Sequence, residues 1–452
     1  MRQLVRRSLL QEERDKDGGR WFKFQPLIQE YAKYKGGDLT QAHQRAINYY
    51  LLNLKQPPWG TIEDVAEYLE IFYHWCELKQ YIPAFNILDY CDEFLTLRGY
   101  NHIQVELYEQ FVKEWNRSQS EWQFTASLTS LGNAYCSLGE YRQAIEYYQQ
   151  SLVIFEEISD HCGIASSLIG LGNVYCSLGE YQGAIAHYQD SLAIYEEIDE
   201  RNGIADSRVG LGNAYLRLGE YQQAIEYYQD SLAIYKKIGD RNSIATPLGN
   251  LGNAYLSLGE YQQAIEYYQE SLAICEEIGN RHGIATSLHN LGSAYLSLGE
   301  YQQAIKHCQQ SLVIFEQISD HCGIASSLIG LGNVYCSIGE YQGAIAYYQD
   351  SLAICEEIGN RHGIANSLNN LGNAYNYLGE YQQAIKYCQQ SLVIQEEIGA
   401  RHGIACSLHN LGNAYDSLGE YQQAIAYHQQ SLAIKEEMRL RQASASAPMS
   451  KN

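Results

Sequence analysis

Residues 171–210 read LGNVYCSLGEYQGAIAHYQDSLAIYEEIDERNGIADSRVG, and close copies of this stretch recur along the chain. The Leu-Gly pair that opens it returns at intervals of 40 residues, and a fixed interval of this length is the signature of a repeat protein. Eight copies fill residues 120–438. The pairs are Leu131-Gly132, Leu171-Gly172, Leu211-Gly212, Leu251-Gly252, Leu291-Gly292, Leu331-Gly332, Leu371-Gly372 and Leu411-Gly412.

Each copy contains two helical patterns. In the second copy, Leu171, Tyr175 and Leu178 have the spacing of one helical face. Gly179 follows as the left-handed residue that favours a helix end, and the apolar spacing resumes over residues 181–198. We therefore expect a helical hairpin in every repeat.

A single hairpin of this kind cannot bury its own apolar stripe, so neighbouring hairpins must stack. The sequence predicts an all-α fold in which antiparallel helix pairs form a right-handed α-solenoid with one continuous core. Gly132 and its counterparts lie inside the first helix, where glycine costs about 1 kcal/mol relative to alanine. Its presence in every copy predicts a close crossing of two backbones at this position.

The first repeat has six positions of defined residue type and spacing, namely Leu131, Gly132, Tyr135, Ala144, Tyr148 and Ser151. They match the tetratricopeptide signature, so the chain resembles a tetratricopeptide-repeat protein. The copies have 40 residues rather than the usual 34, which is similar to the repeats of Pins and kinesin light chains. The resemblance implies a superhelix whose first helices line a concave groove for protein segments.

An asparagine follows the Leu-Gly pair in seven of the eight repeats, and Ser293 takes its place in the fifth. Asparagine is a mediocre helix former, so its recurrence requires a tertiary reason. The resemblance to Pins and kinesin light chains implies that the row holds a peptide backbone, because a carboxamide both donates and accepts hydrogen bonds. A structural bond between neighbouring helices is the alternative, and the sequence leaves both open. The row consists of Asn133, Asn173, Asn213, Asn253, Asn333, Asn373 and Asn413.

The positions four residues before this row vary from repeat to repeat. A fixed polar row beside a varied one is what a groove requires if it grips a backbone and selects side chains. Three polar residues at the varied positions complete the candidate groove, and these are His289, Asn369 and His409.

The chain before residue 123 is a different kind of sequence, which holds all five tryptophans. Within residues 38–119, the stretch Leu78–Phe85 echoes Leu138–Ile145. This echo predicts a helical connector with a degenerate hairpin that caps the first repeat. Residues 439–452 are rich in serine and alanine, and we expect a disordered tail there.

Residues 1–37 predict a third region. We expect a helix over Leu4–Leu10, a strand over Arg20–Phe24 and a second helix through Tyr34. The stretches Leu4–Leu10 and Phe24–Ala32 resemble the last part of the winged-helix module in STAND-type signalling NTPases, the NB-ARC group. The resemblance implies a partial winged-helix segment on the sensor arm of such a regulator, although no G-x-x-x-x-G-K-[ST] phosphate loop occurs in the sequence.

The chain has 31 Lys and Arg against 53 Asp and Glu, a formal net charge of −22. Such a charge disfavours nucleic acid and anionic membranes as partners. No apolar run is long enough to span a bilayer, and the basic start of the chain leads into no apolar signal core. We expect a cytoplasmic protein without nucleic-acid or membrane partners.

The twelve cysteines include many at equivalent sites of the repeats, and no C-x-x-C pair occurs. We expect reduced, mostly packed thiols and no metal site. No Ser/His/Asp or Cys/His set stands out, and repetition argues against a single catalytic centre. The sequence predicts a protein that is not an enzyme and that needs no cofactor.

Three functions fit these features. The first is a non-catalytic scaffold that binds an extended segment of a protein or peptide, whose identity the sequence does not give. The second is the sensor arm of a STAND-type NTPase. The third is a self-assembling solenoid in which an exposed last repeat stacks end to end on another copy.

Overall fold

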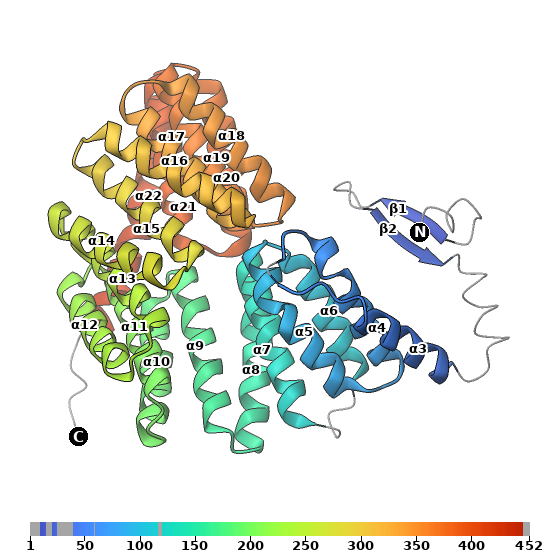
Figure 1. Ribbon diagram of the computed structural model, residues 1–452. Coiled ribbons are helices and arrows are strands. Elements are labelled where there is room, and N and C mark those ends of the chain that lie inside the picture. The colour runs from blue at the N-terminus through green and yellow to red at the C-terminus, as the bar shows by residue number, and fades with distance from the viewer. Residues whose placement is uncertain (1–9, 15–19, 25–38, 58, 116–119, 446–452) are drawn as a thin grey trace. The chain divides into compact units, whose positions relative to one another are not determined.

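The structure is a computed structural model that describes residues 10–14, 20–24, 39–57, 59–115 and 120–445. The chain divides into two compact units, residues 1–93 and residues 94–452, and each is described by itself. Figure 1 shows the helices and strands of both.

The first unit contains a two-stranded antiparallel sheet of β1 (Leu10–Arg14) and β2 (Arg20–Phe24), in which Leu10 pairs with Phe24. The strand predicted over Arg20–Phe24 is confirmed. Its aromatic residues favour an extended backbone. The helix predicted over Leu4–Leu10 is wrong at Leu10, whose backbone is paired in the sheet. The rest of that helix, and the second one through Tyr34, lie outside the described residues.

The turn at Lys79 has the geometry of the turn between the two helices of the first repeat, in agreement with the similarity of Leu78–Phe85 to Leu138–Ile145. Lys79 has a left-handed φ of 55°, and its N–H donates to the carbonyl of Cys76 at 2.8 Å. Gly139 makes the same bond to Cys136 at 3.0 Å in the first repeat. The helices of this region are α3 (Thr40–Leu51), the 3-10 helix η1 (Ile62–Asp64), α4 (Ala66–Glu77) and α5 (Tyr81–Leu97).

The second unit continues from α6 into eight helix pairs, one for each repeat, which confirms the predicted α-solenoid. Its last helix runs to Ala445, past the start of the disordered tail predicted after Met438, because Arg439–Gln442 are good helix formers. The predicted boundaries after residues 37 and 119 stay predictions. The helices are α6 (Asn101–Glu114), α7 (Glu121–Leu138), α8 (Tyr141–Glu157), α9 (His161–Leu178), α10 (Tyr181–Glu197), α11 (Arg201–Leu218), α12 (Tyr221–Ile238), α13 (Arg241–Leu258), α14 (Tyr261–Ile278), α15 (Arg281–Ser297), α16 (Tyr301–Ile318), α17 (His321–Ser337), α18 (Tyr341–Glu357), α19 (Arg361–Leu378), α20 (Tyr381–Ile398), α21 (Arg401–Leu418) and α22 (Tyr421–Ala445).

Short loops of fixed geometry connect these helices. Gly179 ends α9 with a left-handed φ of 81°, as predicted, and Asp199 takes the same conformation at the end of the second helix. The next first helix is often capped by a side chain. At α17, for example, the carboxylate of Asp320 accepts from the N–H of Gly323 at 2.9 Å. We call the loop within a repeat the hairpin loop and the loop between repeats the joining loop.

The glycine of each Leu-Gly pair packs under a side chain of the second helix. A Cβ on Gly172 would overlap the ring of Tyr188, and a Cβ on Gly212 would overlap the ring of Tyr228. The close crossing of two backbones predicted here is therefore wrong in these repeats, since the glycine makes room for an aromatic ring. Tyr188 is fully buried and packs with Leu211 of the next repeat in one apolar cluster.

Buried serines join neighbouring repeats. The Oγ atom of Ser191 lies 3.0 Å from the Oγ atom of Ser207, and both side chains are fully buried. These small pairs let two helices approach closely while each hydroxyl keeps a hydrogen-bond partner. The pattern breaks at Pro247, and the Ser231 hydroxyl lacks a partner among the described residues. The equivalent pairs are Ser151–Ser167, Ser271–Ser287, Ser311–Ser327, Ser351–Ser367 and Ser391–Ser407.

The solenoid of the second unit bends until its last repeats touch its first ones, α22 contacting α10 (Figure 1). Nη1 of Arg361 lies 3.2 Å from Oε1 of Glu140, 221 residues away. Ile398 and Ala400, at the joining loop before the eighth repeat, belong to the same apolar cluster as Tyr141. Successive turns of the superhelix are thus in direct contact.

Candidate functional site

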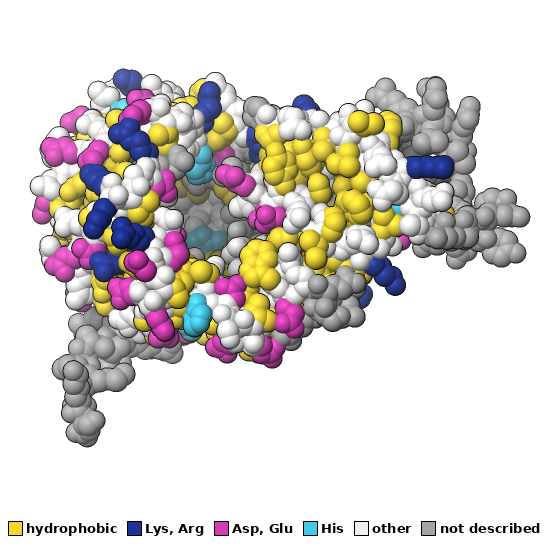
Figure 2. Space-filling view, turned by 60° about the horizontal axis from the view of Figure 1, so that its bottom comes forward, with side chains coloured by type: hydrophobic (Ala, Val, Ile, Leu, Met, Phe, Trp, Pro, Cys, Tyr) yellow, Lys and Arg dark blue, Asp and Glu magenta, His cyan; other side chains and the backbone are white. Residues whose placement is uncertain are grey.

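The first helices of the repeats form the inner wall of the solenoid. Consecutive first helices, such as α9 and α11 or α19 and α21, lie closer to one another than consecutive second helices do. A stack of helix pairs curves toward the side on which its helices are closer, so the first helices line the concave side. Figure 2 shows a hollow in the surface, with histidine side chains in its wall.

The predicted asparagine row lies on these first helices, and each of five members is bonded to a tyrosine of its own repeat. The amide Oδ1 of Asn173 accepts from the hydroxyl of Tyr188 at 2.6 Å. Asn133 and Asn173 are exposed, whereas Asn213 is half-buried. The other bonds are Tyr148 to Asn133 at 2.5 Å, Tyr228 to Asn213 at 2.8 Å, Tyr268 to Asn253 at 2.6 Å and Tyr348 to Asn333 at 2.7 Å.

The tyrosines fix the orientation of the carboxamides. Burial raises the pKa of Tyr188 and of its four counterparts well above the ordinary range of a phenol. Each hydroxyl therefore keeps its proton and donates it to the asparagine oxygen. The amide nitrogen, with two N–H donors, remains on the other side of the carboxamide. In these repeats the tyrosine uses one lone pair of each amide oxygen, and it leaves both N–H donors of the amide nitrogen unused.

Three repeats lack the tyrosine. Ser293 replaces the asparagine in the fifth repeat, and Cys308 stands at the tyrosine position of the same repeat. The seventh and eighth repeats keep Asn373 and Asn413, but the tyrosine position holds Cys388 and His428. The structural bond that the sequence left open is therefore present in five repeats, where it joins the two helices of one repeat.

The three additional groove candidates have different environments. His289 lies beside Gly330, and its Nδ1 has no hydrogen-bond partner among the described residues. Burial lowers the pKa of His289, so the ring is neutral at neutral pH. Oδ1 of Asn369 accepts from Nδ2 of Asn410 at 3.0 Å. His409 is exposed, and its ring centroid lies 5.2 Å from that of His428.

Sequence reasoning missed the tyrosines as part of this site, because it used Tyr148 only as a position of the repeat signature. A signal was available in the repeats themselves. Each bonded pair is separated by the same 15 residues, and the fifth repeat loses both members together as Ser293 and Cys308. This joint loss points to a contact, but the signal is weak, because the seventh and eighth repeats keep Asn373 and Asn413 without the tyrosine.

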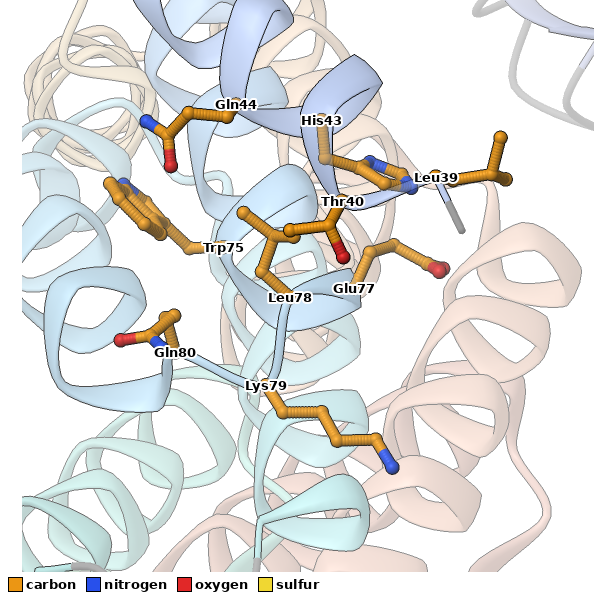
Figure 3. Close-up of a pocket in the computed structure, with 9 residues that line it drawn as sticks. All are labelled: Leu39, Thr40, His43, Gln44, Trp75, Glu77, Leu78, Lys79 and Gln80. Atoms are coloured by element: carbon orange, nitrogen blue, oxygen red, sulfur yellow. The ribbon is translucent and has the colours of Figure 1, made fainter. Parts of the chain in front are cut away.

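A second concave feature lies in the first unit, between α3 and the turn that follows α4 (Figure 3). Its volume is about 750 Å³. Nδ1 of His43 lies 2.9 Å from Nδ1 of His74, and burial lowers the pKa of His74. In Figure 3 the side chains of Glu77 and Lys79 lie on the side opposite Trp75, and no set of polar groups converges. The lining residues are Leu39, Thr40, His43, Gln44, Trp75, Glu77, Leu78, Lys79 and Gln80.

The cysteines are unpaired thiols, most of them buried or half-buried. Burial raises the pKa of Cys322 to about 11, whereas Cys162, in a nearly identical sequence, is exposed. Within the described ranges, no group of three or more His, Cys, Asp or Glu side chains is placed to hold a metal ion. The described helices also include none with the length and apolar composition needed to cross a membrane.

Thiol reagents are expected to modify Cys162 before the other eleven cysteines. The pKa of both thiols is raised, by burial first, so the difference in access decides the order, and half-buried Cys322 should react roughly tenfold or more slowly than exposed Cys162. Labelling with a chromogenic disulfide should show one fast thiol in the native protein. Cys162→Ser should remove that phase and Cys322→Ser should leave it, and the reverse result would contradict the assigned environments.

The tetratricopeptide-repeat family model matches residues 123–197, 203–277, 283–357 and 363–437. No curated protein sequence matches the chain.

Among solved structures, a Rap protein complexed with competence and sporulation factor has a TM-score of 0.54 and 16% identity, and the match covers 84% of this chain and 99% of that one. The Rap conjugation gene regulator of the plasmid pLS20, in complex with the Phr* peptide, has a TM-score of 0.54 and 16% identity over 78% and 99%. Aspartyl phosphate phosphatase F from Bacillus subtilis has a TM-score of 0.50 and 14% identity over 84% and 96%. The TM-scores show a shared fold, and at these low identities they show the fold alone. With four family matches that together span most of its length, the chain belongs to the tetratricopeptide-repeat family.

Proposed function

We propose that this protein is a non-catalytic interaction scaffold that holds an extended segment of a protein partner against its first helices. The observation that supports the proposal is the orientation of the asparagine row. Because Tyr188 and its counterparts occupy the amide oxygens, the N–H donors of Asn173 and its counterparts are left for a ligand.

An extended peptide is the ligand that suits such a row. Its backbone carbonyl oxygens recur at regular intervals whatever its side chains, and each is an acceptor for an amide donor. The varied positions beside the row then provide the side-chain contacts that distinguish one segment from another. Exposed His409 and half-buried Asn369 are the polar members of that set, and we include His289 with them.

Two of the structural relatives have titles that name a bound factor or peptide, the competence and sporulation factor and the Phr* peptide. Both cover more than three quarters of this chain. Their fold supports the proposal that this solenoid also binds a protein segment.

Replacing Asn173 and Asn213 together by aspartate tests the proposal. Aspartate keeps an oxygen for Tyr188 and Tyr228 but has no N–H donor, so binding should weaken while folding is retained. Two lost hydrogen bonds correspond to roughly a tenfold or greater increase in Kd. The measurement is isothermal titration of the full chain with a peptide selected from a displayed random library.

Two controls separate binding from stability. Gln189→Glu with Gln229→Glu makes the same chemical change at exposed positions of the second helices and should leave Kd unchanged. Tyr188→Phe with Tyr228→Phe removes the bond that orients the carboxamides but leaves their N–H donors in place, so it should lower the melting temperature and weaken binding less than the aspartate pair does. If the tyrosine and asparagine variants lose the same affinity, the row is structural and the proposal is wrong.

A second candidate, the sensor arm of a STAND-type NTPase, is favoured by one observation. The hairpin of β1 and β2 is the element that a wing requires. Its test is whether an NTPase with a phosphate-binding loop, expressed with this chain, co-purifies with it and changes its hydrolysis rate. An unchanged rate would count against this second role and leave the scaffold proposal intact.

A further inference from the structure

The contacts between turns of the solenoid recur with the period of the sequence. The hairpin loop at Gly139 lies against Arg361, and the hairpin loop at Gly179 lies against Arg401. The residue numbers of both partners are higher by 40 in the second contact, so the same contact recurs one repeat later. The chain therefore contains a complementary pair of edges, one made of hairpin loops and the other of joining loops.

Each edge contributes an apolar residue and a charge. On the joining edge, Ile358 is 4% exposed and Ile398 is 6% exposed. On the hairpin edge, Leu138 lies against Gly359 and Glu140 accepts from Arg361. The contact thus pairs a Leu-Gly-Glu hairpin loop with an Ile-Gly-x-Arg joining loop.

The fourth, fifth and sixth repeats carry the same hairpin loops without a partner in the described part of the chain. Leu258, Leu298 and Ile338 are 41%, 39% and 40% exposed. Nothing lies within 4 Å of a Cβ built on the glycine that follows each of them. The next residues are Glu260, Glu300 and Glu340, and none of their three carboxylates has a hydrogen bond or ion pair within the described ranges.

Two joining loops are free in the same way. Ile238 is 37% exposed, and nothing lies within 4 Å of a Cβ built on Gly239 or Gly279. Arg241 pairs with Glu277 of its own edge, as Arg361 pairs with Glu397. Because Arg361 also binds Glu140, the pairing on its own edge leaves the guanidinium able to bind a second carboxylate.

We propose that these free edges bind a second copy of this chain, with the hairpin loops of one copy packed against the joining loops of the other. The packing is the one that the chain already makes between its own turns, with leucine or isoleucine against glycine and glutamate against arginine. The inference goes beyond the proposed function, because the edges are separate from the asparagine row. It also differs from stacking of the last repeat, since the contact is between loops.

The interface joins two different surfaces and is therefore heterologous. A copy that uses its hairpin edge still has a free joining edge, so the association is open and can continue beyond a dimer. Burial of three exposed apolar side chains provides the driving force, and the complementary charges set the register.

Sedimentation equilibrium of the full chain tests the proposal. The unmodified protein should show an average mass that rises above 51.3 kDa over roughly a hundredfold range of concentration. A hairpin-edge variant carries Leu258→Arg, Leu298→Arg and Ile338→Arg, and each substitution places a cation opposite the arginines of the joining edge. Association should weaken by at least about tenfold.

A joining-edge variant supplies the complementary half of the test. It carries Ile238→Ser, Arg241→Ser and Arg281→Ser, which remove the apolar and cationic groups without adding a charge, and alone it should also stay near 51.3 kDa. An equimolar mixture of the two variants contains one intact edge of each kind, so it should form a dimer and stop there. A mixture that stays monomeric would contradict the heterologous pairing.

The matched control places three arginines on the outer face of the second helices, as Val153→Arg, Val313→Arg and Val393→Arg. These valines are 53%, 48% and 52% exposed, so the control adds the same charge at positions that are also exposed and apolar. The control should associate as the unmodified protein does. The proposal is overturned if the unmodified chain stays monomeric throughout, or if the control variant is as weak as the edge variants.

Discussion

Replacing Gly212 with alanine is expected to lower the free energy of unfolding by about 3 kcal/mol. The added Cβ would overlap the ring of Tyr228, whose three nearest atoms all lie closer than real Cβ contacts do. The ring is unable to move aside, because Tyr228 is fully buried and its hydroxyl is bonded to Asn213. One methyl group therefore forces apart the two helices of the third repeat.

A matched substitution separates this packing effect from helix propensity. Gly249 also lies inside a first helix, but nothing lies within 4 Å of a Cβ built on it. Gly249→Ala should raise the free energy of unfolding by about 1 kcal/mol, since alanine favours a helix. Urea titrations followed by far-UV circular dichroism measure both variants. Equal shifts of the same sign would contradict the role assigned to Gly212.

Pro247→Ser is expected to raise the free energy of unfolding by about 3 kcal/mol, which is the usual cost of a proline in a helix interior. Pro247 lies inside α13, where it removes the N–H that would bond to the carbonyl of Ser243. It also takes the position that holds a serine in the other repeats, so Ser231 lacks a partner in the described chain. A serine restores both bonds.

Pro247→Ala divides the gain into its two parts. Alanine restores the backbone N–H but leaves the Ser231 hydroxyl buried without a partner, so it should fall short of serine by about 1 kcal/mol. The melting temperature and the urea midpoint of the three proteins provide the measurement. A serine variant no more stable than the native chain would show that α13 already relieves the proline by local adjustment.

Much of the repeat architecture was predictable because it depends on local rules. The 40-residue period gave the number of helix pairs, and Gly179 marked the end of a first helix. The prediction for Gly132 was right about close packing but wrong about the partner, which is the Tyr148 ring. The prediction that residues after Met438 are disordered failed as far as Ala445, since composition alone does not say where the last helix ends.

The candidate groove was predictable in part. The asparagine row was visible as a pattern, but the choice between a ligand and a structural bond depends on where a side chain 15 residues later points. Only the fold places Tyr188 beside Asn173 and so directs the amide oxygen inward. The same holds for His289, whose burial beside Gly330 follows from the smaller Cys308 at the tyrosine position.

The sequence by itself determined the repeating unit: its two helices, its stops and its shared core. Only the tertiary structure decided which copies of that unit differ in the burial and contacts of equivalent residues. Asp160 and Asp320 lie in nearly identical segments, yet Asp320 is 3% exposed while Asp160 is only half-buried. His321, the next residue, lies near Tyr100, which is far away in the sequence. The physical reason is that a small rotation between neighbouring repeats accumulates over about five and a half repeats, and no single repeat encodes where the second turn meets the first.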